Sequence, residues 1–226
     1  MSNNQKHNTG ASTQIKKGSG SFVLENQKSL AFIIGAIVVL ILLYIGYQRF
    51  YLAPRAETAA DQLYKAETYA TIDSLQQRAI EGDGSYPGFK EIAAEYENTR
   101  SANVANAYLG GLYLRQGQYQ EAIDALENYS NTGSAILDPL VIGMLGDAYS
   151  ELKDYKQAAS YYKKAAEKNQ NMFTSPLLLK KLGLVYEAQN DFEQAIAAYK
   201  QIQADYPESH EASIVESYIA RAEAQL

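Results

Sequence analysis

The sequence predicts an all-α protein in which helical hairpins stack into a solenoid behind a single N-terminal transmembrane helix. The main observation is a spacing that occurs three times: a Leu-Gly pair, a tyrosine three residues after the glycine and an alanine twelve residues after it. The repeated residues are Leu109, Gly110, Tyr113 and Ala122; Leu145, Gly146, Tyr149 and Ala158; and Leu182, Gly183, Tyr186 and Ala195. The glycines are 36 and 37 residues apart, a period typical of stacked helical hairpins. The second observation is an apolar run near the N-terminus.

Residues 1–28 are predicted to form a flexible polar tail, because residues 1–24 are rich in Ser, Asn, Gln, Gly and Thr without a periodic apolar face. Residues 29–51 are predicted to form the transmembrane helix. Twenty consecutive residues from Ser29 to Gln48 carry no charge, and as a helix they are about 30 Å long, the thickness of a hydrocarbon core. A cleaved signal peptide usually has a shorter apolar region followed by small residues. Bulky residues follow this run instead, so we expect an uncleaved anchor.

Basic residues on the two sides of this run bear on its orientation. They are Lys6, Lys16, Lys17 and Lys28 before it, and Arg49, Arg55 and Lys65 after it. This small excess favours a cytoplasmic N-terminus, which in a bacterial inner membrane places the C-terminal body in the periplasm; the opposite topology stays open. Ala31 and Gly35 have the spacing that lets two such helices approach closely, so a homo-oligomer also stays open.

Residues 55–100 are predicted to contain a linker helix and a degenerate hairpin. Alanine and leucine recur at helical spacing from Arg55 to about Ile80, and Gly82-Asp83-Gly84 is expected to end that helix. Pro87 is expected in the first turn of a second helix that continues to Tyr96.

Residues 101–226 are predicted to hold three clear hairpins, at about 101–131, 139–169 and 176–205, and a C-terminal capping helix at 210–225. Asp138 and Ser175 each precede a proline and are expected to cap the next helix. Gly117, Lys153 and Asn190 are expected to be the left-handed residues of the turns within the hairpins, where lysine costs about 1 kcal/mol. Each repeated glycine is expected to meet the alanine twelve residues later.

These positions resemble the tetratricopeptide repeat, well over residues 101–207 and weakly over 55–100. Pro207 matches the proline that ends the family's second helix, whereas Asn106, Ile142 and Leu179 stand where the family has an aromatic residue. The resemblance implies a protein-binding array without catalytic chemistry.

A polar N-terminus, one span and an acidic repeat body together resemble the YfgM-like ancillary subunits of the Sec translocon, and residues 25–31 are similar to that family's entry into the membrane. The segments 82–84, 88–89, 174–176 and 179–188 resemble membrane-anchored tetratricopeptide proteins of the Bacteroidota. Both resemblances imply service in the periplasm beside the secretion machinery or its chaperones.

The resemblance also places the first helix of each hairpin along a concave groove, which is the predicted site for a protein or peptide partner. The candidate residues are Tyr108, Gly111, Arg115, Met144, Asp147, Glu151, Lys180, Lys181, Leu184 and Glu187. The alternative is that these residues are ordinary solvated surface and that binding uses the convex face or the edges.

Composition indicates no enzyme, cofactor or metal site. Residues 55–226 carry fifteen Lys/Arg against twenty-five Asp/Glu, which argues against nucleic acid. The chain has no cysteine, and its two histidines, His7 and His210, lack partners at ligand spacing. We therefore expect a membrane-anchored adaptor that binds a protein near the translocation or chaperone machinery. A cytosol-facing receptor for precursor proteins and a self-associating envelope scaffold are the alternatives.

Overall fold

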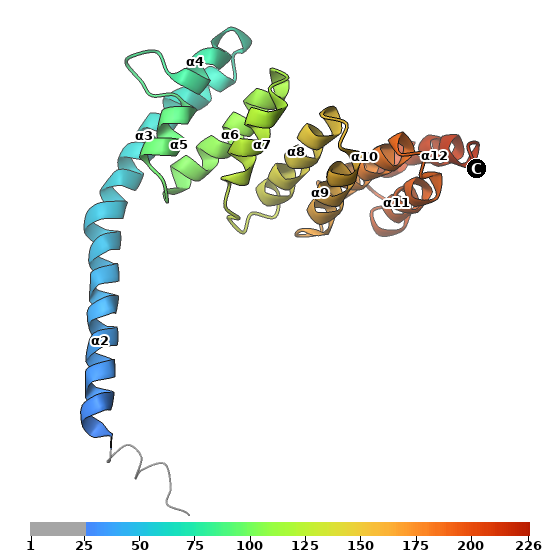
Figure 1. Cartoon of the computed structure of the whole chain (residues 1–226). Helices are drawn as coiled ribbons and strands as arrows, with labels where there is room; N and C mark the ends of the chain where they lie inside the picture. The colour runs from blue at the N-terminus through green and yellow to red at the C-terminus, as the bar shows by residue number, and fades with distance from the viewer. Residues whose placement is uncertain (1–25) are drawn as a thin grey trace, which may run out of the picture. The chain divides into compact units, whose positions relative to one another are not determined.

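The computed structural model describes residues 26–226 and divides the chain into two compact units, Met1–Tyr51 and Leu52–Leu226. Figure 1 shows both, and each is described here by itself. The predicted tail up to residue 25, with His7 and the first three lysines used for orientation, lies outside the described residues.

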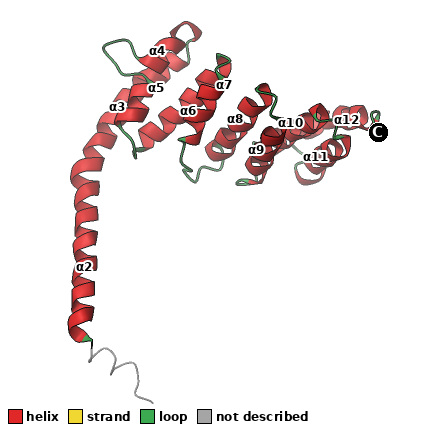
Figure 2. Ribbon diagram, in the orientation of Figure 1, coloured by secondary structure: helices red, strands yellow, loops and turns green. Residues whose placement is uncertain are grey.

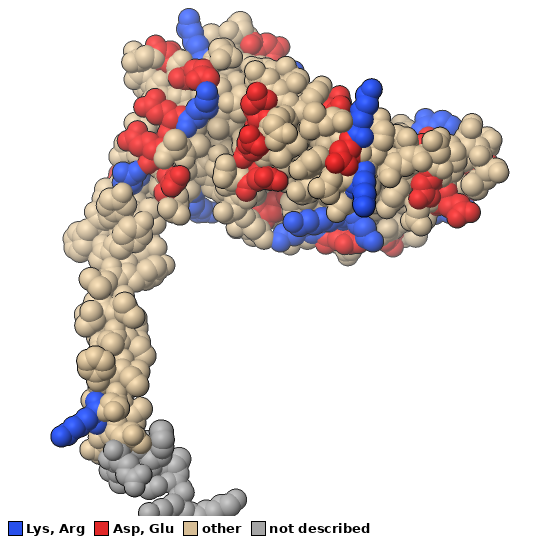
Figure 3. Space-filling model, viewed as in Figure 1, with Lys and Arg blue, Asp and Glu red and all other residues tan. Residues whose placement is uncertain are grey.

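In the first unit, α2 (Gln27–Gly46) is followed by a π-helical segment, η1 (Tyr47–Leu52). No residue of α2 is buried, and its apolar side chains are exposed all round. Within residues 26–226, one helical stretch is long and apolar enough to cross a membrane, with a mean hydropathy of 2.8 in its most apolar window. The space-filling view shows this column as almost free of charged side chains (Figure 3).

The second unit is built of helices, as the sequence predicts, and the part of the chain that the structure describes has no extended strand (Figure 2). Its elements are α3 (Ala53–Ala70), η2 (Asp73–Leu75), α4 (Gln76–Glu81), α5 (Phe89–Glu95), α6 (Arg100–Arg115), α7 (Tyr119–Glu127), α8 (Leu137–Glu151), α9 (Tyr155–Glu167), α10 (Ser175–Ala188), α11 (Phe192–Asp205) and α12 (His210–Glu223). Helices α6 and α7, α8 and α9, and α10 and α11 form three successive hairpins. The predicted fold class is therefore confirmed.

The turns within the hairpins have the predicted conformation. Gly117, Lys153 and Asn190 have φ of 72°, 64° and 61°. In the second and third hairpins the next residue, Asp154 or Asp191, accepts a hydrogen bond from a backbone N–H in the first turn of α9 or α11. Each such turn therefore ends one helix with a left-handed residue, and in two of them an acidic side chain begins the next helix.

The glycines allow the two helices of each hairpin to approach closely, and the side chain nearest to each glycine is not the predicted alanine. A Cβ at Gly110 would lie 2.3 Å from Leu126. The alanines Ala122, Ala158 and Ala195 are buried, yet the side chain over each glycine comes from four residues later: Leu126 over Gly110, Tyr162 over Gly146 and Tyr199 over Gly183. Helical side chains lean toward the N-terminus of their own helix, so the residue one turn after the alanine covers that spot.

Asp138 does not cap a helix as expected, because α8 already begins at Leu137. Its carboxylate is 1 % exposed and holds the preceding loop instead. It accepts hydrogen bonds from the Tyr129 hydroxyl at 2.7 Å, from the backbone N–H and hydroxyl of Thr132, and from the Gly133 N–H at 2.8 Å. Burial alone would raise the pKa of Asp138, but these donors outweigh it and the pKa is lowered.

Ser175 also fails to cap, because it is the first residue of α10 and its hydroxyl accepts a hydrogen bond from the Asn171 N–H. Asn171 organises this loop through its side-chain oxygen, which accepts from the N–H groups of Phe173 and Thr174 at 2.9 Å. In both connections between hairpins a polar side chain therefore satisfies loop backbone groups rather than a helix end.

The region before the hairpins departs from the prediction in two places. The expected helix from Arg55 to Ile80 breaks after Ala70, so that α3 and α4 are separate helices. Pro87 precedes α5 and pairs with Gly82 instead of lying in the first turn. At the other end, α12 buries Val215, Ile219 and Ala222 against the array and closes its core.

Candidate functional site

The ten predicted groove residues lie on α6, α8 and α10, the first helices of the three hairpins, and we call this surface the first-helix face. Tyr108, Arg115, Glu151 and Leu184 are exposed, and the other six are partly buried. About half of the ten form hydrogen bonds or ion pairs with neighbouring helices. These contacts differ between the three hairpins.

In the second hairpin, Asp147 links three helices. The Tyr162 hydroxyl of α9 donates to Asp147 Oδ1 at 2.6 Å, and Lys181 Nζ of α10 lies 2.6 Å from the same oxygen. Burial, with the nearby Asp147 carboxylate, raises the pKa of Tyr162. Asp147 and Lys181 therefore connect the second hairpin to the third.

In the third hairpin, Glu187 has the corresponding role. The Tyr199 hydroxyl donates to Glu187 Oε1 at 2.6 Å, and the Arg221 guanidinium of α12 donates to both carboxylate oxygens, at 2.8 and 3.0 Å. Burial opposes ionisation of Glu187, but the hydrogen bonds from Arg221 and Tyr199 lower its pKa. Lys180 pairs with Glu211 of α12 at 3.5 Å.

The first hairpin has no such link. Leu126 occupies the position of the two tyrosines and has no hydroxyl, and Gly111 stands where the second hairpin has Asp147. Arg115 forms no ion pair within residues 26–226. Tyr108 is 37 % exposed and stacks on Phe89 with ring centroids 4.8 Å apart. This part of the first-helix face presents an aromatic ring, a guanidinium group and bare backbone.

Met144 of α8 extends this part of the face. Its sulfur would lie 3.6 Å from a Cβ placed at Gly111, so the two residues are neighbours across α6 and α8. Glu151 accepts a hydrogen bond from the Tyr119 hydroxyl at 3.2 Å, and Leu184 is 39 % exposed. Such a surface is suited to protein or peptide contacts. No group of three His, Cys, Asp or Glu suited to a metal ion occurs in residues 26–226.

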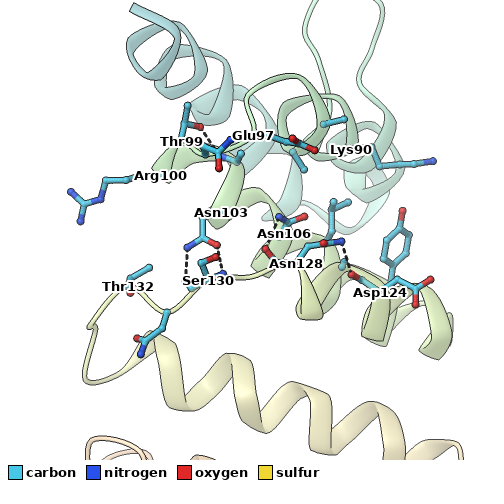
Figure 4. Close-up of a pocket in the computed structure, with 18 of the residues that line it drawn as sticks. Lys90, Glu97, Thr99, Arg100, Asn103, Asn106, Asp124, Asn128, Ser130 and Thr132 are labelled. Atoms are coloured by element: carbon cyan, nitrogen blue, oxygen red, sulfur yellow. Dashed lines mark hydrogen bonds between the residues drawn. The ribbon is translucent and has the colours of Figure 1, made fainter. Parts of the chain in front are cut away.

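A groove lies on another part of the second unit, and none of the ten predicted residues lines it. It is an open groove of about 920 Å³ between α5, α6 and α7, lined by many polar groups (Figure 4). Asn103, Asn106 and Tyr113 of α6 line it, and at 100° per residue they lie roughly opposite Tyr108 and Arg115 on that helix. The groove is therefore on a different side of the array from the first-helix face.

The chain's own loop occupies part of this groove. Asn103 clamps the backbone of Ser130 with two hydrogen bonds, donating to its carbonyl at 2.7 Å and accepting from its N–H at 2.6 Å (Figure 4). Asn106 donates to the Asn128 carbonyl at 3.4 Å. Sequence reasoning missed this role, although Asn106 in place of an aromatic residue was the signal that could have revealed it.

Stacked two-helix hairpins of similar length define the protein as an all-α helical repeat protein. The family model of the tetratricopeptide repeat matches residues 144–210 and 180–223, so such repeats are detected from α8 to α12. Such repeats generally mediate protein–protein interactions and are typically found in non-enzymatic scaffolds.

No curated protein matches the sequence. Among solved structures the chain is similar to the crystal structure of BtubC (BKLC) from P. vanneervenii, with 16 % sequence identity and a TM-score of 0.49. The similarity covers 78 % of this chain and 82 % of that chain.

Proposed function

We propose that the protein is a membrane-anchored adaptor that binds a protein partner through the part of the first-helix face formed by α6 and α8. The observation that carries the proposal is the difference between hairpins. The second and third use their acidic residues to hold the next helix, whereas Gly111, Arg115 and Met144 have no such use. Tyr108 contacts Glu67 and Phe89 of the preceding helices, and 37 % of it stays exposed. Aromatic, arginine and methionine side chains are enriched at protein interfaces.

The anchor in this proposal is α2, whose apolar side chains are exposed and would be covered by lipid. Tethering confines the repeats to a thin layer at the membrane and raises their effective concentration for other membrane proteins. With the N-terminus in the cytoplasm of a bacterium, the repeats face the periplasm, where a partner in the translocation or chaperone machinery is within reach.

Crosslinking in cells tests this proposal. A photoreactive residue at position 108 or 144 of the full chain should capture the same protein, a component of the translocation or chaperone machinery. A photoreactive residue at Gln120, which is exposed on the second helix of the same hairpin, is the control and should not capture it. Capture of only lipid and further copies of the chain from position 108, or equal capture from 120, would contradict the proposed site.

Protease accessibility tests the topology separately. If the repeats face the periplasm, residues 55–226 should resist added protease in intact cells and be cleaved once the outer membrane is permeabilised. If cleavage requires opening of the inner membrane, the repeats face the cytosol and the precursor-receptor alternative gains support.

A further inference from the structure

One edge of the second unit is formed by the connections between hairpins, and we call it the loop edge. It consists of residues 96–99, 128–136 and 168–174, which join α5 to α6, α7 to α8 and α9 to α10. These connections appear in green along one side of the array, while the turns within the hairpins lie along the other side (Figure 2).

Hydrogen bonds make the loop edge continuous. The Asn103 side chain at the start of α6 clamps Ser130 in the second connection. The Asn171 side chain in the third connection donates to the Ala135 carbonyl in the second at 3.0 Å. The connections are therefore held together as one surface.

The loop edge carries unusually little charge over two of its connections. Charged residues make up 20 % of the chain, yet residues 128–136 and 169–174 contain none, and the loop edge has Glu97 and Lys168 as its charged residues. The turns along the opposite side, residues 116–118, 152–154 and 189–191, carry Lys153, Asp154 and Asp191. A solvated loop gains nothing from lacking charge, so this asymmetry points to a different environment at the loop edge.

Apolar side chains project from these two uncharged stretches. Ile136 is 43 % exposed, Met172 47 % and Phe173 73 %. Asn, Ser and Thr surround them in the sequence. Exposed apolar patches mark protein or membrane contacts, and segments that lie in the interface of a bilayer place such side chains at the headgroup level.

The chain enters the second unit at this edge. The Arg55 guanidinium, at the start of α3, donates a hydrogen bond to the Glu95 carbonyl and lies 5.4 Å from the centroid of the Tyr96 ring, beside the first connection. Leu52, just before α3, is the last residue of η1, the segment that follows the apolar helix.

We propose that the loop edge lies against the lipid surface, with Phe173, Met172 and Ile136 at the headgroup level. The inference rests on the membrane anchoring in the proposed function, but not on its partner or on the topology. Because residues 128–136 and 169–174 carry no charge, the contact needs no anionic lipid. It fixes the array edge-on to the membrane and leaves the first-helix face open to a partner.

The absence of cysteine makes a direct test possible, because single cysteines can carry a nitroxide probe in the full chain. Met172→Cys is the test variant, and Leu152→Cys is its matched control, because Leu152 is 46 % exposed in the turn between α8 and α9. In phosphatidylcholine vesicles, the probe at 172 should collide with dissolved oxygen several-fold more, relative to a water-soluble nickel chelate, than the probe at 152.

A third probe separates failure of the anchor from failure of the loop edge. Leu40→Cys, in the middle of α2, should report the depth of the hydrocarbon core. If position 40 is in lipid but positions 172 and 152 are equally open to the chelate, the loop-edge proposal is wrong and the anchor stands. If position 40 is itself open to the chelate, both are wrong.

Other occupants of the loop edge give different results, and each would overturn the proposal. A second copy of the chain would broaden the spectrum at 172, and dilution with unlabelled chain would remove the broadening. A protein partner would protect 172 in native membranes but not in pure lipid. An added Phe173→Asp substitution should reduce the lipid exposure of the probe at 172 without changing thermal stability, because Phe173 is 73 % exposed.

Discussion

The first hairpin and the two that follow have the same helix–turn–helix backbone. They differ in the side chains that link each hairpin to the next helix. In each, a glycine on the first helix lies beneath a large side chain of the second. Where that side chain is Tyr162 or Tyr199, its hydroxyl donates to an acidic residue, which in turn binds Lys181 of α10 or Arg221 of α12. Where it is Leu126, no such link forms. The first hairpin thus lacks both the hydroxyl and the acidic residue of this link, since Gly111 stands where the second hairpin has Asp147.

The largest effect is expected where the first hairpin joins the second. Asp138→Asn removes a buried carboxylate that accepts four hydrogen bonds, and it should lower the free energy of unfolding by about 2–3 kcal/mol. Urea unfolding of the full chain in detergent, followed by circular dichroism, measures this. Ser134→Ala in the same loop is a milder comparison, since its hydroxyl accepts from only the Ile136 and Leu137 N–H groups.

Asp138 also makes the stability of the folded protein depend on pH. The pKa of Asp138 is lowered in the folded protein, so its contribution is present above the unfolded value of 3.8 and is lost as the pH falls through the folded value. Between about pH 5 and pH 3 the native protein should therefore lose more stability than Asp138→Asn. Equal losses in the two proteins would contradict this assignment.

A smaller loss is expected from a methyl group beneath Tyr199. A Cβ at Gly183 would lie 2.2 Å from the ring, so Gly183→Ala should cost about 1–2 kcal/mol after the gain in helix propensity. Gly111→Ala is the matched control, because its Cβ would meet only Met144 at 3.6 Å, and it should raise stability by about 0.5–1 kcal/mol. Similar melting temperatures for the two variants would show that close helix approach is not what requires glycine.

Removing one hydroxyl tests the link between hairpins. Tyr162→Phe leaves the ring over Gly146 but deprives Asp147 of a donor, so stability should fall by about 1 kcal/mol. Tyr119→Phe removes a longer and more exposed hydrogen bond to Glu151, and its effect should be within about 0.5 kcal/mol. A larger effect at 119 than at 162 would reverse the assigned roles.

A small effect on stability should accompany a complete loss of partner binding in the last variant. Leu126→Tyr, Gly111→Asp and Met144→Lys together transfer the Tyr162–Asp147–Lys181 link to the first hairpin. The expected change in stability is within about 1 kcal/mol, while crosslinking from Tyr108 to its partner should be lost. Retained capture by a folded triple variant would place the partner on another surface.

The sequence was sufficient for the features that each hairpin decides locally. The left-handed turn residues follow from chain geometry at a fixed point of the repeat, and the buried alanines follow from helical periodicity. The contacts of Gly146 and Asp138 could not be predicted in this way. They depend on how side chains lean across helices and on loop conformations that the repeat spacing does not specify.

The candidate site shows the same limit. The spacing placed ten residues on one helix face but could not show that Asp147 and Glu187 are held by the next helix while Tyr108 is not. That difference depends on the residue sixteen positions after each glycine. The repeat pattern requires only a large side chain at this position and does not distinguish leucine from tyrosine. The sequence shows that Asn106 stands where the family has an aromatic residue. It does not show which backbone carbonyl accepts the hydrogen bond from its side chain.

The two repeat distances differ by one residue, and the structure shows where the addition is accommodated. From glycine to turn to covering side chain, all three hairpins keep identical internal spacing, so the extra position falls between Tyr162 and Gly183. The second helix, and not the connection, takes up the addition: α9 has 13 residues against 9 in α7, whereas residues 168–174 are fewer than residues 128–136. The end of the second helix is therefore the point at which the repeats of this chain vary in length.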